Sequence, residues 1–310
     1  MNSIPYFDAH ADTLSMCAFF GKDFAENNGH IDLKRAAQFE KFAQFFSIFA
    51  DGKGSSDIRH YYDRILGVIL DEVKKNEHCA AVCRNVSELE NTRGKSCVFI
   101  SVEGAELIGC SAEGLRKAWE DGVRMLTLTW NYDNDLAGSC GGEGNKGLTE
   151  RGREVVKLAD ELGVIIDVSH ASEKTFWDVA EVSTKPFVAS HSNSAAVWPH
   201  RRNLTNDQFS HLVKCGGAAG INLYADFLGD KVDMACVVRH IENFMSLGGE
   251  KNVCLGGDLD GCDRLPEGMN GVQDMHMIYE ALLRLNYNED VVRDIFFNNL
   301  KRVVHTVCGI

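Results

Sequence analysis

Residues 164–191 read VIIDVSHASEKTFWDVAEVSTKPFVASH, and this stretch decides the fold of the chain. Two apolar, β-branched runs, 164–169 and 186–190, flank a segment of helical periodicity at 173–182. Nearly continuous apolar strands are typical of a parallel sheet that is covered on both faces, and such sheets are built from strand–helix–strand units. The stretch therefore predicts one such unit, and each of its strands is followed by the dipeptide Ser-His.

The same alternation extends over the whole chain. Strand-like runs occur at 4–9, 43–49, 97–102, 124–129, 164–169, 186–190, 217–223 and 253–257. Segments with helical periodicity occur at 57–78, 112–121, 150–162, 173–182, 205–215, 233–247, 273–285 and 289–307. Eight strands with crossover helices predict an α/β protein with a (β/α)8 TIM-like barrel. No linker interrupts the pattern, so we expect one domain over residues 1–310.

Side chains that can bind metal follow several of the predicted strands. His10 and Asp12 form an H-x-D motif after the first run, and Glu103 follows the third. His170 and His191 end two neighbouring strands, so on a barrel their imidazoles point toward the same place. Each residue alone has an ordinary structural explanation, such as a helix cap or a hydrogen-bonded loop. Together they predict a metal site at the carboxyl ends of the strands.

Two aspartates, Asp258 and Asp260, follow the last run in the sequence GGDLDG. This mixture of nitrogen and oxygen ligands favours zinc, and a carboxylate such as Glu103 can bridge two ions. Two divalent ions a few ångströms apart generate a hydroxide at neutral pH and polarise a carbonyl or phosphoryl group. The residues therefore predict metal-assisted hydrolysis.

Composition excludes other classes of function. The chain has 32 basic and 45 acidic residues, a formal charge of −13, which disfavours a nucleic-acid partner. No basic and apolar leader begins the sequence and no run of about 18 apolar residues occurs, so we expect no membrane association and a cytoplasmic location. The eleven cysteines include no C-x-x-C pair and predict reduced, mostly buried thiols; Cys79 and Cys83 are expected on one helix.

An ordered series of motifs resembles the membrane, or renal, dipeptidases of the amidohydrolase superfamily over essentially the whole length. These motifs are FDAHAD (7–12), QFF (44–46), VEG (102–104), GVR (122–124), LTLT (126–129), DVSH (167–170), SHS (190–192), RRN (201–203) and GDLDG (257–261). The resemblance implies a distorted barrel with two zinc ions per subunit. It also implies that His10 and Asp12 hold one ion, that His170 and His191 hold the other, and that Glu103 bridges them.

The resemblance further implies a substrate and a mechanism. Members of the family cleave dipeptides and tolerate or prefer a D-residue on the C-terminal side. Arg202 matches the arginine that binds the free carboxylate of the dipeptide, as a bidentate guanidinium can. Asp258 matches the proton shuttle between the attacking water and the departing amine, with Asp260 as the fallback for that role.

One position departs from the family. Animal-type dipeptidases have a histidine after the Leu-Thr pair of the fourth strand, which contacts the scissile carbonyl oxygen, and this chain has Trp130. Tryptophan donates one N–H but carries no positive charge. Either Trp130 shapes the pocket or Asn131 takes over the contact, and we also place Tyr224 in the substrate pocket.

The sequence therefore predicts a binuclear zinc dipeptidase that acts on small dipeptides. For the assembly of the protein we consider a homodimer. A second hypothesis is another amidohydrolase acting on N-acyl amino acids, cyclic amides or lactones. A third, motivated by Trp130, is a catalytically impaired metal-binding homologue.

Overall fold

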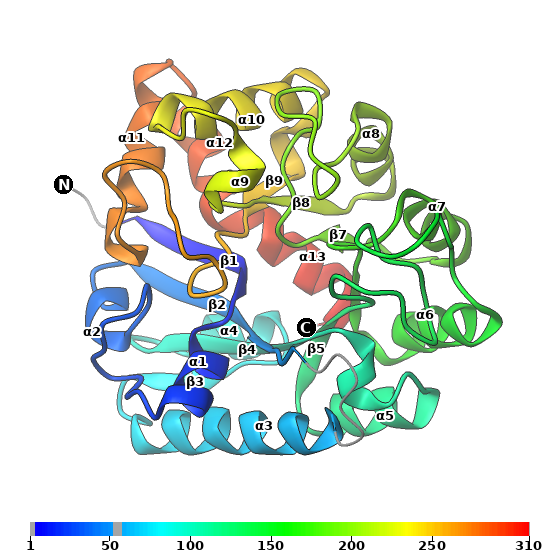
Figure 1. The fold of residues 1–310 in the computed structure, drawn as a ribbon. Helices are drawn as coiled ribbons and strands as arrows, with labels where there is room; N and C mark the ends of the chain where they lie inside the picture. The colour runs from blue at the N-terminus through cyan, green and yellow to red at the C-terminus, as the bar shows by residue number, and fades with distance from the viewer. Residues whose placement is uncertain (1–3, 52–57, 310) are drawn as a thin grey trace.

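Eight parallel strands close into a barrel in the computed structural model, which describes residues 4–51 and 58–309. They follow one another around the ring in chain order, β1 pairs with β9, and β2 pairs with β4 to complete the circle (Figure 1). The strands are β1 (Pro5–Ala11), β2 (Lys41–Ile48), β4 (Ser96–Glu103), β5 (Val123–Thr127), β6 (Ile165–Asp167), β7 (Val188–Ala189), β8 (Ala218–Ile221) and β9 (Val253–Leu255). Each predicted apolar run overlaps one of them, so the predicted (β/α)8 barrel is confirmed.

A further strand, β3 (Ala80–Val82), was not predicted from the sequence. It pairs with residues 96–98 at the start of β4, and β5 pairs with β4 from residue 100 onward. The prediction that one helix contains both Cys79 and Cys83 is therefore wrong. The helix α3 (Ile58–Lys75) ends before Cys79, and Cys83 comes directly after β3. A strand of three residues is too short to show a period of its own.

Helices surround the barrel, and the longer ones begin and end close to their predicted limits (Figure 1). Four of them start at a Ser or Thr side chain that accepts a backbone N–H of the first turn, and Thr205 with Gln208 forms the complete capping box. The longer helices besides α3 are α5 (Ala112–Glu120), α6 (Glu150–Leu162), α7 (Glu173–Val182), α8 (Asn206–Cys215), α10 (Met234–Ser246) and α11 (His276–Arg284). Shorter ones are α1 (Thr13–Phe20), α2 (Leu33–Ala36), α4 (Val86–Asn91), α9 (Ala225–Leu228) and the 3₁₀ turns Ala105–Ile108, Gly249–Lys251 and Val272–Asp274. Among the described residues, no helix combines the length and apolar character needed to cross a membrane.

The C-terminal segment closes one end of the barrel. The helix predicted at 289–307 consists of α12 (Glu289–Arg293), a π-helical turn (Asp294–Asn298) and α13 (Asn299–Cys308). Apolar side chains of α13, including Leu300 and Val303, form one buried cluster with inward-facing residues of the strands, such as Phe7, Phe45 and Phe99. Because α13 contacts β1, β6, β8 and β9, it covers one end of the barrel interior. The polar residues described next gather where the strands end.

Candidate metal centre

His10 and Asp12 lie at the end of β1, where the pairing with β2 is irregular between Asp8 and Ala11. The buried Asp8 carboxylate accepts the backbone N–H of His10 at 2.9 Å and so fixes this bend. His10 Nε2 lies 3.6 Å from Asp12 Oδ2 and 3.9 Å from Asp258 Oδ1. The end of β1 thus directs an imidazole and a carboxylate toward Asp258, a carboxylate from the far end of the chain.

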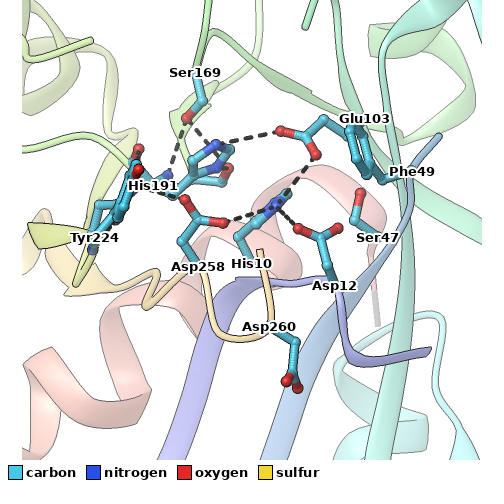
Figure 2. Close-up of polar contacts among 12 residues, drawn as sticks. His10, Asp12, Ser47, Phe49, Glu103, Ser169, His191, Tyr224, Asp258 and Asp260 are labelled. Carbon is cyan, nitrogen blue, oxygen red and sulfur yellow. Dashed lines mark hydrogen bonds and ion pairs between the residues drawn. The ribbon is translucent and has the colours of Figure 1, made fainter. Parts of the chain in front are cut away.

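Glu103, the last residue of β4, is 3% exposed and lies between two groups of nitrogen and oxygen atoms. Its Oε2 is 3.6 Å from His10 Nε2. Its Oε1 is 3.0 Å from His170 Nε2 and 3.5 Å from His191 Nε2. Figure 2 shows one oxygen of the carboxylate directed toward His10 and the other toward His191. This is the arrangement that a bridging carboxylate requires.

His170 and His191 follow β6 and β7, and their Nε2 atoms are 3.0 Å apart. His170 has a left-handed backbone, with φ of 66°. Its carbonyl oxygen accepts hydrogen bonds from Cys140 N at 2.8 Å, Ser139 Oγ at 3.1 Å and Thr129 Oγ1 at 3.3 Å. Three donors can hold a conformation that residues other than glycine rarely adopt. The glycine-rich loop after β5 is therefore anchored on the backbone of His170.

Burial and charge shift the pKa values of these side chains in opposite directions. Burial alone lowers the pKa of His10, but the surrounding carboxylates, Glu103 first, raise it to about 10. Burial raises the pKa of Glu103 well above its ordinary value and holds the pKa values of His170 and His191 well below theirs. Burial thus disfavours both an ionised Glu103 and protonated forms of His170 and His191. A divalent cation compensates for both effects, because it neutralises the carboxylates and binds imidazole in its neutral form.

Several nitrogen and oxygen atoms of this cluster lack a hydrogen-bond partner among the described residues. Both ring nitrogens of His10 and Oδ1 of Asp12 are buried without a hydrogen bond among the described residues. An unpaired buried polar atom costs about 1–3 kcal/mol, and such atoms are rare in native proteins. Ligand atoms converge within 4.8 Å in two groups, which are His10, Glu103 and His191, and His10, Asp12 and Asp258. The residues present therefore fit a metal centre.

The two aspartates after β9 have different surroundings. Asp258 Oδ2 accepts a hydrogen bond from Asn222 Nδ2 at 3.0 Å, and its Oδ1 faces the ligands. The Asp260 carboxylate accepts hydrogen bonds from the backbone N–H of His30 at 2.7 Å and from Thr13 Oγ1 at 2.5 Å. Figure 2 shows it turned away from the ligands. Asp260 therefore ties loops together, and Asp258 is the aspartate that reaches the site.

Gly261 makes room for two of the carboxylates. A Cβ at this position would lie 2.2 Å from Asp12 Oδ2 and 2.3 Å from Asp258 Oδ1. Both distances are shorter than the closest approach of a non-bonded carbon and oxygen, so this arrangement requires a glycine at position 261.

Trp130 and Tyr224 line a cavity of about 370 Å³, and Asp12, Glu103 and His170 line it as well. The Trp130 ring lies 5.0 Å from that of Phe49 and 5.5 Å from that of Tyr132, and Tyr224 packs against Phe227 at 4.9 Å. Sequence reasoning missed Phe49 and Phe227, because aromatic residues beyond strand ends carry no signal that separates a pocket from a core.

Asn131 and Arg202 contact His170 and His191. Asn131 also lines this cavity, and its Oδ1 lies 2.9 Å from His170 Nδ1, so this side chain holds the imidazole ring as well as facing the cavity. Arg202 is 5% exposed and makes long hydrogen bonds, 3.4 Å to Ser192 Oγ and 3.3 Å to the carbonyl of His191. Its Nε has no partner, and no carboxylate of the described residues lies within 4.0 Å of its guanidinium.

Arg202 borders a second cavity, of about 650 Å³, which shares His170 with the first. A buried guanidinium without a carboxylate is costly unless an anion binds to it. The two cavities together therefore offer a metal centre with a cationic side chain beside it.

Comparisons with known proteins agree with this geometry. The model of the membrane dipeptidase family, peptidase family M19, matches residues 1–309. An uncharacterized dipeptidase from Schizosaccharomyces pombe is 28% identical over 309 residues, which cover 91% of this chain and 74% of that protein. An uncharacterized protein from the pqqA 5′ region of Klebsiella pneumoniae is 30% identical over 240 residues, covering 73% of this chain and 88% of that protein.

Solved structures are similar over the whole length. A metallo peptidase from Rhodobacter sphaeroides, liganded with a phosphinate mimic of the dipeptide L-Ala-D-Ala, has a TM-score of 0.89 and 26% identity, covering 99% of this chain and 100% of that chain. A metallo peptidase of family M19, dipeptidase AC, has a TM-score of 0.89 and 27% identity, with 100% of both chains covered.

Proposed function

The chain belongs to the membrane dipeptidase family, peptidase family M19, and from this premise we propose that it is a binuclear zinc dipeptidase for substrates with free amino and carboxyl ends. Membership makes it a metallo-dipeptidase, a hydrolase of peptide bonds. The observation that carries the binuclear proposal is the position of Glu103, whose Oε2 faces His10 while its Oε1 faces His170 and His191.

In this proposal the five ligands divide into two sets. His10 and Asp12 hold one zinc ion, His170 and His191 hold the other, and Glu103 lies between them. A mixture of imidazole and carboxylate suits zinc. The bound ions supply an activated water and polarise the scissile carbonyl.

Asp258 is the proposed proton shuttle. Its Oδ1 lies on the ligand side, and the hydrogen bond from Asn222 to its Oδ2 holds the carboxylate in that orientation. From there Oδ1 can take a proton from the attacking water and deliver it to the departing amine. Asp260 is excluded from this role by its own hydrogen bonds to His30 and Thr13.

Arg202 is proposed to bind the carboxylate of the substrate. Its burial and its missing partner at Nε support this role. The Rhodobacter sphaeroides relative was solved with a mimic of L-Ala-D-Ala, and we propose that this chain also accepts a D-residue on the C-terminal side. Trp130, next to Phe49, is proposed to shape the wall of the smaller cavity.

The experiment that tests this function combines metal analysis with a screen of dipeptides. The purified chain is loaded with zinc, its metal content is measured, and hydrolysis of matched L-L and L-D pairs is followed by the amine released. Two zinc ions per chain and turnover of dipeptides are expected. Bound metal without turnover of any dipeptide would favour the catalytically impaired homologue.

Substitution of Arg202 tests the carboxylate contact. Arg202→Lys keeps the charge but loses the two-pronged geometry, so kcat/KM for dipeptides should fall roughly 10- to 100-fold, mainly through KM, as for the loss of charged hydrogen bonds. Arg201→Lys, at the exposed neighbouring position, is the matched control and should change little. Unchanged kinetics in Arg202→Lys, together with turnover of substrates that lack a carboxylate, would support the amidohydrolase alternative instead.

A further inference from the structure

A series of hydrogen bonds in the barrel interior leads from a buried carboxylate to the ring of His191. Asp167, the last residue of β6, is fully buried and accepts hydrogen bonds from Thr127 Oγ1 at 2.6 Å, Ser169 N at 2.9 Å, Ser190 N at 2.8 Å and Ser190 Oγ at 2.6 Å. Ser190 Oγ in turn lies 2.7 Å from His191 Nδ1. All of these side chains are buried.

The chemistry of the groups sets the direction of this series. An ionised carboxylate only accepts hydrogen bonds, and a serine hydroxyl has one hydrogen to donate. If Ser190 donated that hydrogen to His191, its oxygen would face Asp167 Oδ2 at 2.6 Å with no hydrogen between them. The hydrogen therefore goes to Asp167, and Ser190 Oγ accepts from His191 Nδ1–H.

This direction leaves the other ring nitrogen of His191 with a free lone pair. Nε2 lies 3.0 Å from His170 Nε2 and 3.5 Å from Glu103 Oε1, inside the ligand cluster. We infer that Asp167 and Ser190 are positioning residues, which hold His191 in the Nδ1-protonated tautomer and so present its Nε2 to a zinc ion. The inference rests on the proposed function only in taking His191 as a zinc ligand.

Of the two histidines, only His191 has a hydrogen bond at Nδ1 whose donor and acceptor follow from the chemistry of the groups. Asn131 supports His170 in a similar place, at 2.9 Å from its Nδ1, but an amide can present either its oxygen or its nitrogen. Carboxylate-backed histidines are a general device for raising the basicity of a zinc ligand and fixing its ring. Here the carboxylate acts through a hydroxyl.

Ser190→Thr and Ser190→Val test the hydroxyl, because the two variants have the same shape and differ in this group. The full-length chain is stripped of metal, reloaded with zinc and titrated against a chromophoric chelator. Ser190→Thr should retain both zinc ions at near wild-type affinity. Ser190→Val should lose roughly 10- to 100-fold in affinity for one zinc ion, the usual effect of removing an outer partner of a ligand.

Ser169→Ala is the matched control for the loss of a buried hydroxyl in the same cluster. Ser169 Oγ accepts the backbone N–H of His191 at 3.0 Å and lies 3.3 Å from Ser190 Oγ, but it does not bond to the ring. This variant should therefore lose less zinc affinity than Ser190→Val. Thermal unfolding of the metal-free variants shows whether either change acts through folding.

Asp167→Asn distinguishes the series from a merely structural role. The amide oxygen still has to accept the backbone N–H groups of Ser169 and Ser190, so the amide NH2 group faces Ser190 Oγ. This donor would reverse the hydroxyl and favour the wrong tautomer of His191, so zinc affinity should fall as in Ser190→Val. In a chain that carries both Asp167→Asn and Ser190→Val, Asp167→Asn should add no further loss of zinc affinity, because Ser190→Val has already broken the series of hydrogen bonds.

The outcomes separate the inference from the proposed function. A wild-type chain that binds two zinc ions while Ser190→Val binds them as tightly, or fully additive losses in the double variant, would overturn the positioning role alone. A wild-type chain that binds no zinc through His191 would overturn the binuclear proposal and the positioning role with it.

Discussion

Three residues in the left-handed region of the backbone, His170, Asp258 and Asp260, lie at the strand ends that build the metal centre, with φ of 66°, 56° and 66°. Such a conformation costs a residue other than glycine about 1–3 kcal/mol and persists where surrounding contacts hold it in place. Around His170 these contacts are three hydrogen bonds to one carbonyl oxygen. Strain at this place is consistent with a site whose ligands must be held in position.

Gly261 gives a prediction at this scale. Gly261→Ala would force the carboxylates of Asp12 and Asp258 apart, so metal content and kcat should both fall severely while the circular dichroism of the fold is retained. Gly67→Ala is the control, because nothing lies within 4 Å of its new Cβ and alanine favours the surrounding helix α3. If Gly261→Ala kept its full metal content and activity, the described arrangement of the two carboxylates would be wrong.

Single residues also show the limit of sequence reasoning. The candidate ligands could be proposed from the sequence because each follows an apolar strand, and the barrel brings them together. The role of Asn131 could not be found, since its contact with His170 depends on the path of a loop. Ser190 and Asp167 form part of recognised motifs, but only the distances show how they support His191.

At the scale of elements, strands and helices were predictable where burial gives a clear period. The eight barrel strands are covered on both faces and the longer helices on one, so both leave a pattern. β3 left none, because a three-residue strand beside the edge of β4 is too short. The π-helical turn at Asp294–Asn298 was equally hidden, since it keeps the apolar face of the helix on either side of it.

The closing helix α13 carries a prediction of stability. Leu300 is fully buried between α13 and the barrel interior, so Leu300→Ala should lower the free energy of unfolding by about 2–5 kcal/mol. His305→Ala, at an exposed position of the same helix, is the control and should cost little. Chemical denaturation of the metal-free chain measures both. Equal stability of the two variants would contradict the role of α13 in closing the barrel.

At the scale of the whole molecule, metal and folding are coupled through the charge of the site. In the metal-free protein the pKa of His10 rises from its ordinary 6.5 to about 10. A raised pKa in the folded state gives stability that is complete below about pH 6.5 and is lost as pH rises through about 10. The metal-free chain should therefore melt at progressively lower temperature from about pH 7 to about pH 10.

Zinc should remove this dependence, because the ion neutralises the carboxylates in place of the proton on His10. Melting curves with and without chelator across this pH range make the comparison, with the metal-free His10→Asn chain as control, which should show a flatter profile. A zinc-loaded chain that loses stability with pH as steeply as the metal-free one would contradict this coupling.

The net charge of −13 has its meaning at this scale as well. It sets the long-range field and colloidal behaviour of the molecule, whereas the potential inside the site would be set by the proposed zinc ions and by Arg202. The overall acidity therefore does not argue against an anionic substrate group.

The most direct test of the account is a crystal structure of the zinc-loaded chain with anomalous scattering recorded at the zinc absorption edge. Two anomalous peaks are expected, one on either side of Glu103, the first in contact with His10 and Asp12 and the second with His170 and His191. A single peak, or peaks that do not share Glu103, would contradict the binuclear centre.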